Sequence, residues 1–356
     1  SLREEVAERL AYMHKRIEAG SYLTAKASPL SAADTEVFLP DAQSLANSGG
    51  ELRVVLIETP LRCGPRTEGL YKKPEAGRSI DVDFDRNNCS TLRPQELVRV
   101  LSSPGPSKDG MRLVRSAYAL GWVKSAAALS PPLSVEQAGA FAASDKWRVL
   151  RDLDLRSGQE ALMKVRPRTL LAMAAGEEAR ASFATAKGVF RSQLLEPAAV
   201  TSTKRPLTRA ALLKEAFDYL GSPYGWGGEK AGRDCSRFLM DVFASFGVAL
   251  PRYSSLQARA GNMVVDLTKA KSSAERLSLM DEAHARGIVL LHFPGHIMLY
   301  LGRDQGGEPM AIHAFAEYLV PCAKTDPKTP DQKETLLKVD RLTVSNLELG
   351  RGTSRR

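Results

Sequence analysis

The chain carries at residues 223–238 the sequence Pro-Tyr-Gly-Trp-Gly-Gly-Glu-Lys-Ala-Gly-Arg-Asp-Cys-Ser-Arg-Phe. The glycine-rich first half is typical of a loop. After Cys235 the apolar residues recur at helical spacing, at Phe238, Leu239, Val242, Phe243 and Phe246. Asp234 is a suitable N-cap and Gly247 a suitable stop. The pattern predicts an amphipathic helix whose first turn holds Cys235.

A cysteine in the first turn of a helix lies beside unpaired backbone N–H groups and the positive end of the helix dipole, which both stabilise an anion. We expect the pKa of Cys235 to fall into a range of roughly 3.5–7.5 if a cationic imidazole is also near. The alternative is a buried and inert cysteine, which is common for a lone thiol.

Two downstream histidines favour the reactive interpretation. His296 begins one apolar run with the character of a strand, and His313 lies within the next, beyond a turn-like hexapeptide. If Gly302 opposes Pro309 in an antiparallel hairpin, the two histidines lie diagonally on one face. A slip of one residue would separate them. In this register His296 is the expected general base for the Cys235 thiol, and His313 orients it.

These residues carry a resemblance to a known family. From about residue 206 to about residue 322 the chain resembles the NlpC/p60 cysteine peptidases, a papain-like α+β fold of bacterial cell-wall enzymes. The matching residues are Pro223-Tyr-Gly-Trp-Gly-Gly228, Asp234-Cys-Ser236, Leu250-Pro-Arg252, Gly295-His296 and His313. The resemblance implies Cys235 as nucleophile, His296 as base and His313 as orienting residue. It further implies that Tyr224, with the Cys235 backbone N–H, positions the nucleophile or holds the oxyanion.

The same resemblance implies a substrate and no cofactor or metal. The expected activity is a γ-D-glutamyl-L-diamino acid endopeptidase that cuts peptidoglycan stem peptides with a free N-terminal L-Ala. The expected substrate-binding residues in this part of the chain are Asp234 and Ser236, which would hold the free amine, together with Trp226 and Ser254. One position departs from the family pattern: Arg237 stands where a glycine is usual, and we expect it to narrow or re-charge the cleft wall.

The N-terminal half consists of short apolar runs between turn residues, which is typical of small antiparallel barrels. The runs expected to be strands are 52–57, 80–84, 97–101, 111–114, 121–124, 147–150, 161–165, 169–173 and 189–190. They resemble two bacterial SH3-like domains. The predicted division is a helix and clip segment at 1–50, barrels at 51–130 and 131–206, and the peptidase at 207–356. By the same resemblance, Tyr118 of the first barrel is the candidate substrate contact, and the alternative is an ordinary barrel aromatic.

The charge and composition of the chain limit the partners and the compartment that we expect. The net charge of +9 fits nucleic acid or an anionic envelope, but the basic residues are dispersed, so we expect an envelope protein, periplasmic or secreted, and no nucleic acid partner. No apolar run approaches the roughly 18 residues of a membrane span. The first residue is Ser rather than Met, which suits a trimmed mature form.

Several alternatives stay open from the residues alone. Cys63 and Cys89 could pair in an oxidising compartment. His292, His296 and His313 could supply three nitrogens to zinc, although this would leave Cys235 without a role. The chain could also be a non-catalytic peptidoglycan-binding protein, or an acyltransferase or amidase on the same fold.

Overall fold

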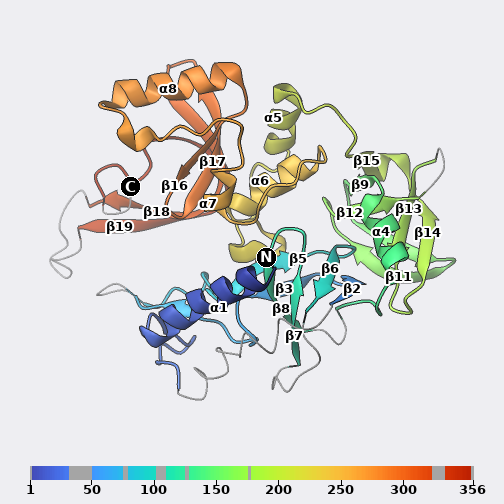
Figure 1. The fold of residues 1–356 in the computed structure, drawn as a ribbon. Helices are drawn as coiled ribbons and strands as arrows, with labels where there is room; N and C mark the ends of the chain where they lie inside the picture. The colour runs from blue at the N-terminus through green and yellow to red at the C-terminus, as the bar shows by residue number, and fades with distance from the viewer. Residues whose placement is uncertain are drawn as a thin grey trace. The chain divides into compact units, whose positions relative to one another are not determined.

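The computed structural model describes residues 2–31, 50–74, 79–101, 110–124, 128–174, 178–322 and 333–353 (Figure 1). The chain divides into two compact units, Ser1–Arg205 and Pro206–Arg356. Both mix helices with antiparallel sheets. The predicted division into four parts stays a prediction, and most of the expected clip, residues 32–49, lies outside the described residues.

The first unit begins with helix α1 (Leu2–Glu18), followed by β1 (Tyr22–Leu23), which pairs with β4 (Tyr71–Lys72). Met13 and Ile17 of this helix are buried. The buried pair packs against Tyr22, Leu70 and a disulfide.

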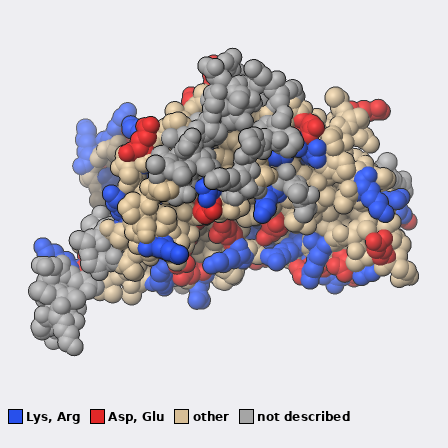
Figure 2. Space-filling model, turned by 90° about the horizontal axis from the view of Figure 1, so that it is seen from below, with Lys and Arg blue, Asp and Glu red and all other residues tan. Residues whose placement is uncertain are grey.

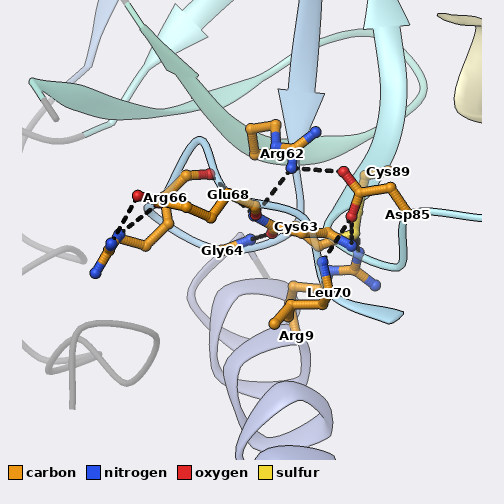
Figure 3. The surroundings of a disulfide bond; sticks show 10 residues. Arg9, Arg62, Cys63, Gly64, Arg66, Glu68, Leu70, Asp85 and Cys89 are labelled. Atoms are coloured by element: carbon orange, nitrogen blue, oxygen red, sulfur yellow. Dashed lines mark hydrogen bonds and ion pairs between the residues drawn. A yellow bond between two sulfur atoms is a disulfide. The ribbon is translucent and has the colours of Figure 1, made fainter. Parts of the chain in front are cut away.

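Cys63 and Cys89 form this disulfide, with Cα atoms 5.1 Å apart. The guanidinium of Arg9, from α1, contacts both sulfur atoms (Figure 3). Beside them the buried Arg62 pairs with Asp85 at 2.7 Å. The pairing that the sequence left open is therefore made, and it joins two segments of the first unit on which the N-terminal helix packs.

The first sheet has six strands in the order β2-β6-β7-β8-β3-β5. Their bounds are β2 (Glu51–Val54), β3 (Thr59–Arg62), β5 (Asn88–Leu92), β6 (Leu97–Val100), β7 (Met111–Arg115) and β8 (Leu120–Lys124). Four of the five strands predicted here are confirmed. The fifth, at 80–84, is wrong, because Asp81 accepts the backbone N–H of Asp83 at 3.1 Å and forms a turn.

The second sheet, in the order β14-β13-β12-β9-β15, has its own core around Leu155, Leu171 and Phe183. Its strands are β9 (Lys146–Val149), β12 (Leu170–Met173), β13 (Arg180–Ala184), β14 (Phe190–Leu194) and β15 (Val200–Ser202), and β10 (Leu153–Ser157) pairs with β11 (Glu160–Val165) beside it. Helix α4 (Val135–Ala143) precedes the sheet, and the 3-10 turn η1 (Pro197–Ala199) precedes β15. That the two sheets are SH3-like barrels stays a prediction.

The second unit packs helices against a four-stranded antiparallel sheet in the order β16-β17-β18-β19 (Figure 1). The strands are β16 (Leu290–Phe293), β17 (His296–Arg303), β18 (Pro309–Pro321) and β19 (Glu334–Asn346). The helices are α5 (Arg209–Phe217), α6 (Cys235–Ala244), α7 (Ser254–Gln257) and α8 (Ser273–Arg286), with 3-10 segments η2 (Trp226–Ala231) and η3 (Leu267–Lys269). The core unites Phe238, Leu239 and Val242 of α6 with Ile297, Leu299 and Ile312 of the sheet.

The β17–β18 hairpin differs from the predicted register at its tip and agrees with it near the histidines. At the tip Gly302 pairs with Met310 and not with Pro309. A β-bulge between Tyr300 and Gly302 then shifts the register by one, so that Leu299 pairs with Ile312. This second register is the one that the sequence predicted for the histidine-bearing part of the hairpin.

One face of the molecule carries charges of both signs. On the face drawn in Figure 2, Lys and Arg alternate with Asp and Glu among uncharged residues. Nucleic-acid-binding surfaces usually carry a cluster of Lys and Arg side chains. The described part of this face has no such cluster. Among the described helices, none has the length and apolar character needed to cross a membrane.

Candidate active site

The loop before α6 is tied to the helix cap. Asp234 is the N-cap and accepts the backbone N–H of Arg237 at 2.9 Å, as predicted. The same carboxylate accepts the N–H of Gly227 at 3.0 Å. Gly227 and Gly228 have φ of 66° and 87°, a region that side chains disfavour. The two glycines therefore let the loop fold back onto the cap, which places Cys235 as the first residue of the helix.

Tyr224 and Trp226 lie in this loop and are half-buried. The backbone N–H of Tyr224 donates to the carbonyl of Asp340 in β19 at 2.9 Å. The Tyr224 side chain packs against the core cluster that contains Cys235. The loop is thus held between helix α6 and the sheet, with Tyr224 on the Cys235 side.

Cys235 is a free thiol with 9% of its surface exposed. It lies in one buried core cluster with Ile297, the residue that follows His296, and the backbone N–H of Ile297 lowers the pKa of the thiol. Strands β17 and β18 are paired only from Leu299 to Arg303, so the N–H of Ile297 is available to the sulfur. Helix α6 therefore meets the sheet at the point where β17 and β18 part.

The charge state of Cys235 differs from the sequence expectation. Burial raises the pKa of the thiol to about 12, and the negative charge of Asp234 adds to the rise. The N–H groups of Ile297 and Ser236 lower the pKa but do not outweigh burial. The predicted fall in pKa is therefore wrong for the ligand-free site, because the sequence does not reveal how deeply the sulfur is buried.

The two histidines lie together on one face of the hairpin. Nε2 of His296 is 2.7 Å from Nδ1 of His313. Burial, with the neighbouring His313, lowers the pKa of His296 to about 3, although the charge of Asp234 acts in the opposite direction. Burial also lowers the pKa of His313 to about 4. Both imidazoles are thus neutral at pH 7, beside a neutral thiol.

The hydrogen-bonded chain extends past the two predicted histidines. Nε2 of His313 is 3.0 Å from Oγ of Ser345 in β19, and the Ser345 hydroxyl donates to the carbonyl of Asn346 at 2.9 Å. Sequence reasoning missed Ser345 because β19 was not predicted. The only signal for β19 was a run of alternating apolar and polar residues near the end of the given sequence.

Asp234 and Ser236, the predicted amine-binding pair, have protein partners. Arg252 donates to Oδ1 of Asp234 at 3.0 Å and to Oγ of Ser236 at 2.7 Å. Burial alone would raise the pKa of Asp234, but the Arg252 charge and the hydrogen bonds from Arg252, Arg237 and Ser236 together lower it, so the carboxyl is ionised. With Gly227, Arg237 and Ser236 as further donors, both carboxylate oxygens are engaged. Arg252, part of the quoted motif, was given no role from the sequence.

Arg237 was expected to narrow or re-charge a cleft wall. The structure places it in the interior with 3% of its surface exposed. Its Nε donates to Asp241 at 3.1 Å, and Arg233 donates to the same carboxylate at 2.6 Å. The Arg237 charge is thus compensated inside the domain. The expectation is wrong because a residue three positions into the first turn of α6 faces inward.

The other two expected contacts belong to different units of the chain. Ser254 is the first residue of α7 and is half-buried. Tyr118 belongs to the first unit, between β7 and β8, where its hydroxyl donates to Glu96 at 2.7 Å and to the Thr91 carbonyl at 3.2 Å.

The zinc alternative finds no support in the arrangement of side chains. Among the described residues, no three or more His, Cys, Asp or Glu side chains are grouped so that they could hold a metal ion. His292 lies exposed on β16, whereas Nε2 of His296 and Nδ1 of His313 face each other.

Parts of the chain are similar to known proteins. Residues 221–333 match the model of the NlpC/P60 family. The chain is 35% identical over 85 residues to the gamma-D-glutamyl-L-lysine dipeptidyl-peptidase of Bacillus cereus, covering 24% of this chain and 23% of that protein. It is 31% identical over 111 residues to the peptidoglycan endopeptidase RipB of Mycobacterium tuberculosis, covering 26% and 40%. The chain thus spans less than half the length of these curated relatives.

A solved structure shares the fold over most of the chain. It is described as a novel NlpC/P60 endopeptidase from Photobacterium damselae subsp. piscicida. The match has a TM-score of 0.72 at 16% identity and covers 99% of this chain and 78% of that one. At this identity the match shows the fold and not the activity.

Proposed function

We propose, from the NlpC/P60 domain formed by residues 221–333, that the chain is a cysteine endopeptidase that hydrolyses the peptides of peptidoglycan. The observation that carries the proposal is that Cys235, at a helix N-terminus, shares a buried core cluster with Ile297, and that the preceding His296 is hydrogen-bonded to His313. One imidazole can take the thiol proton while the second holds it in place. The compartment is the cell envelope, where such peptides occur.

The reaction begins from neutral groups. As the Cys235 sulfur attacks the carbonyl carbon of the scissile amide, the S–H proton passes to His296. The carbonyl oxygen becomes an oxyanion, held by the Cys235 backbone N–H and by Tyr224. The C–N bond then breaks and His296 returns its proton to the leaving amine. A water molecule gives its proton to His296 and attacks the thioester, which releases the carboxylic acid and restores the thiol.

Asp234 assists this proton transfer through its charge. Its carboxylate raises the pKa of His296 against the effect of burial, and so stabilises the imidazolium that forms during attack. Substrate that fills the site also replaces water and strengthens this interaction. A buried thiol with a high resting pKa can therefore react when attack and proton transfer are coupled.

The bond proposed for cleavage joins γ-D-Glu to the following diamino acid, in stem peptides that begin with a free L-Ala. Asp234 would attract the substrate ammonium mainly by charge, because its oxygens already have protein donors. Ser236, Ser254 and Trp226 would supply the remaining contacts near the helix N-terminus. Tyr118 of the first unit is the proposed contact from outside the peptidase domain.

The experiment is product analysis by mass spectrometry with synthetic L-Ala-γ-D-Glu-diamino acid peptides. The wild-type chain should release L-Ala-γ-D-Glu, and Cys235→Ala should release none while still binding the peptide. Cys322→Ala is the matched control, because Cys322 is the other free thiol of the described chain, and it should leave turnover unchanged. Substantial cleavage by Cys235→Ala would overturn the nucleophile.

A second set of peptides tests the amine contact. Asp234→Asn should slow cleavage of free peptides far more than cleavage of N-acetylated ones, and Ser254→Ala should do so more weakly without disturbing the helix cap. Equal losses on both peptides with both variants would count against recognition of the amine.

One observation favours a second function, a non-catalytic peptidoglycan-binding protein. The Cys235 thiol is buried and has a raised pKa, as an inert cysteine would. In that case the wild-type chain and Cys235→Ala would bind stem peptides alike, and neither would cut them. An acyltransferase or amidase would instead appear in the same spectra as products joined to an added amine, or as cleavage at another amide bond.

A further inference from the structure

We propose that Ser345 is a positioning residue that selects the tautomer of both histidines. The claim about catalysis rests on the proposed function, whereas the claim about the tautomers rests on the hydrogen bonds alone. Ser345 lies on β19, and Ala311↔Ser345 and His313↔Thr343 are register pairs. Ser345 is therefore the diagonal neighbour of His313 on the same face of the sheet.

The direction of the hydrogen bonds follows from counting protons. A neutral imidazole has one N–H donor and one bare nitrogen acceptor, and a hydroxyl has one proton to donate. The Ser345 hydroxyl is 2.9 Å from the carbonyl oxygen of Asn346, and because a carbonyl can only accept, the hydroxyl is the donor in this hydrogen bond. The contact of 3.0 Å between Ser345 Oγ and His313 Nε2 is then a hydrogen bond in which Nε2–H donates.

The position of the proton on His313 decides the position of the proton on His296. With its proton on Nε2, His313 has a bare Nδ1, which accepts the Nε2–H of His296 across 2.7 Å. The proton of neutral His296 is thus on Nε2, and its Nδ1 is bare. A bare Nδ1 is the acceptor that the proton of the Cys235 thiol requires.

The opposite direction would disable the base. If the Ser345 hydroxyl donated to Nε2 of His313, then Nδ1–H of His313 would donate to His296. His296 would in turn carry its proton on Nδ1, and its bare Nε2 would already accept from His313, so it would have no free nitrogen to accept the thiol proton. The carbonyl of Asn346 holds the Ser345 hydroxyl away from this arrangement, because it takes the hydroxyl proton.

The same direction suits the charged intermediate. When His296 has accepted the thiol proton, both of its nitrogens donate, and Nδ1 of His313 still accepts from Nε2. Ser345 still accepts from His313. None of these hydrogen bonds has to exchange its donor and acceptor during proton transfer. The polar groups are thus already oriented for the charged intermediate, as in other preorganised sites.

The test is a long-range ¹⁵N–¹H NMR spectrum of the full chain labelled at histidine, which reports the protonated nitrogen of each ring and needs no turnover. We expect Nε2–H at both His296 and His313 in the wild-type chain. Ser345→Ala should mix the two tautomers at His313 and His296. Ser345→Thr keeps the hydroxyl and should restore the wild-type spectrum.

Thr343→Ala is the matched control. Thr343 lies on the same strand and its hydroxyl also donates to the next carbonyl, at 3.3 Å from Val344. Thr343→Ala should leave the tautomers of His296 and His313 unchanged. A change in both variants would point to a general loosening of β19, whereas a change in Ser345→Ala alone would point to loss of the Ser345 acceptor.

Kinetics give the second readout. Ser345→Ala should lower kcat about tenfold and leave KM unchanged, the loss expected for one hydrogen bond, whereas Ser345→Thr and Thr343→Ala should stay within about twofold. Nδ1–H at His296 in the wild-type spectrum would overturn the proposal, as would unchanged tautomers in Ser345→Ala. If the wild-type chain cuts no peptide, the proposed function fails, and the spectra still decide the role of Ser345.

Discussion

Cys235 at the start of helix α6 and Ile297 near the start of strand β17 belong to one buried core cluster, and the backbone N–H of Ile297 lowers the pKa of the Cys235 thiol. This N–H offers a donor to the sulfur when negative charge develops there. Without substrate, burial keeps the proton on the sulfur.

Alkylation of Cys235 should therefore be slow at neutral pH and rise far into the alkaline range. The reactive species is the thiolate, and the pKa of the thiol is raised to about 12. In a Cys322→Ser background, the rate with iodoacetamide at pH 7 should be at least about tenfold below that of free cysteine, whose pKa is about 8.5. A rate that levels off below pH 8 would contradict this.

The histidine pair should make the peptidase domain less stable in acid. Its two pKa values are lowered in the folded state, to about 3 for His296 and about 4 for His313. As pH falls below about 6.5 the unfolded chain binds protons that the folded chain does not, so the free energy of unfolding falls. The slope is at most about 1.4 kcal/mol per pH unit for each histidine, and it should end near pH 3 to 4.

Urea unfolding at a series of pH values measures this slope. His313→Gln removes one titrating group and should reduce the slope between pH 6 and 4. The exposed His292 lies on the neighbouring strand, and His292→Gln serves as the control, with a smaller effect. Equal slopes in all three proteins would rule out the buried pair as the cause.

Breaking the buried pair between Arg252 and Asp234 should destabilise the domain strongly. Arg252→Met leaves the buried carboxylate of Asp234 without its cation, at a cost of about 3–5 kcal/mol. Lys214→Met breaks the exposed pair with Asp218 and should change the stability by less than about 1 kcal/mol. Thermal and urea unfolding compare the two, and a loss for Arg252→Met as small as that for Lys214→Met would contradict the prediction.

Reduction of the disulfide should loosen helix α1. The bridge spans 26 positions, for which a stabilisation of about 2–4 kcal/mol is expected, and Met13 and Ile17 of α1 pack on it. The double variant with Cys63→Ser and Cys89→Ser should be cut faster by trypsin at Lys15 and Arg16. The variant Cys322→Ser should be cut at the wild-type rate, and faster cutting there would point to a cause other than the bridge.

Substitution at the hairpin bulge should be costlier than at its turn. Gly302 has φ 92°, and a Cβ there would lie 2.9 Å from Nε2 of His284. Gly307 has φ 85° and open space around it. Gly307→Ala should cost about 1–2 kcal/mol from backbone strain, and Gly302→Ala clearly more. Similar losses in thermal unfolding would show that His284 moves aside.

The part of the site that could be predicted was the part carried by local pattern. Asp234 gave the start of α6, and the two-residue period of strands placed His296 and His313 on one face. The predicted register held near the histidines only because the sheet inserts one extra residue before Gly302. The alternating pattern alone does not reveal such a bulge.

The other features of the site could not be predicted, because they depend on burial and on partners that are distant in sequence. The direction of the Cys235 pKa shift, the interior position of Arg237 and the role of Arg252 all follow from packing that one sequence does not display. Ser345 lies 32 positions from His313 and belongs to no recognisable motif.

Two of the helices that were not predicted, α4 and α8, had local signals in the sequence. Ser134 and Gln137 form a capping box at α4, and Ser272 caps α8 by accepting from Glu275. Both have the Ser-x-x-Gln or Ser-x-x-Glu spacing that marks a helix start. A search for that spacing would have found them.

The chain of hydrogen bonds that starts at His296 finishes on the main-chain oxygen of Asn346, a group with no proton to release and little tendency to gain one. A proton that enters beside the sulfur thus has no exit at the far end. Every proton exchanged in a catalytic cycle must then arrive and depart with the reactants themselves, and the number held by the enzyme is the same after each turnover as before it.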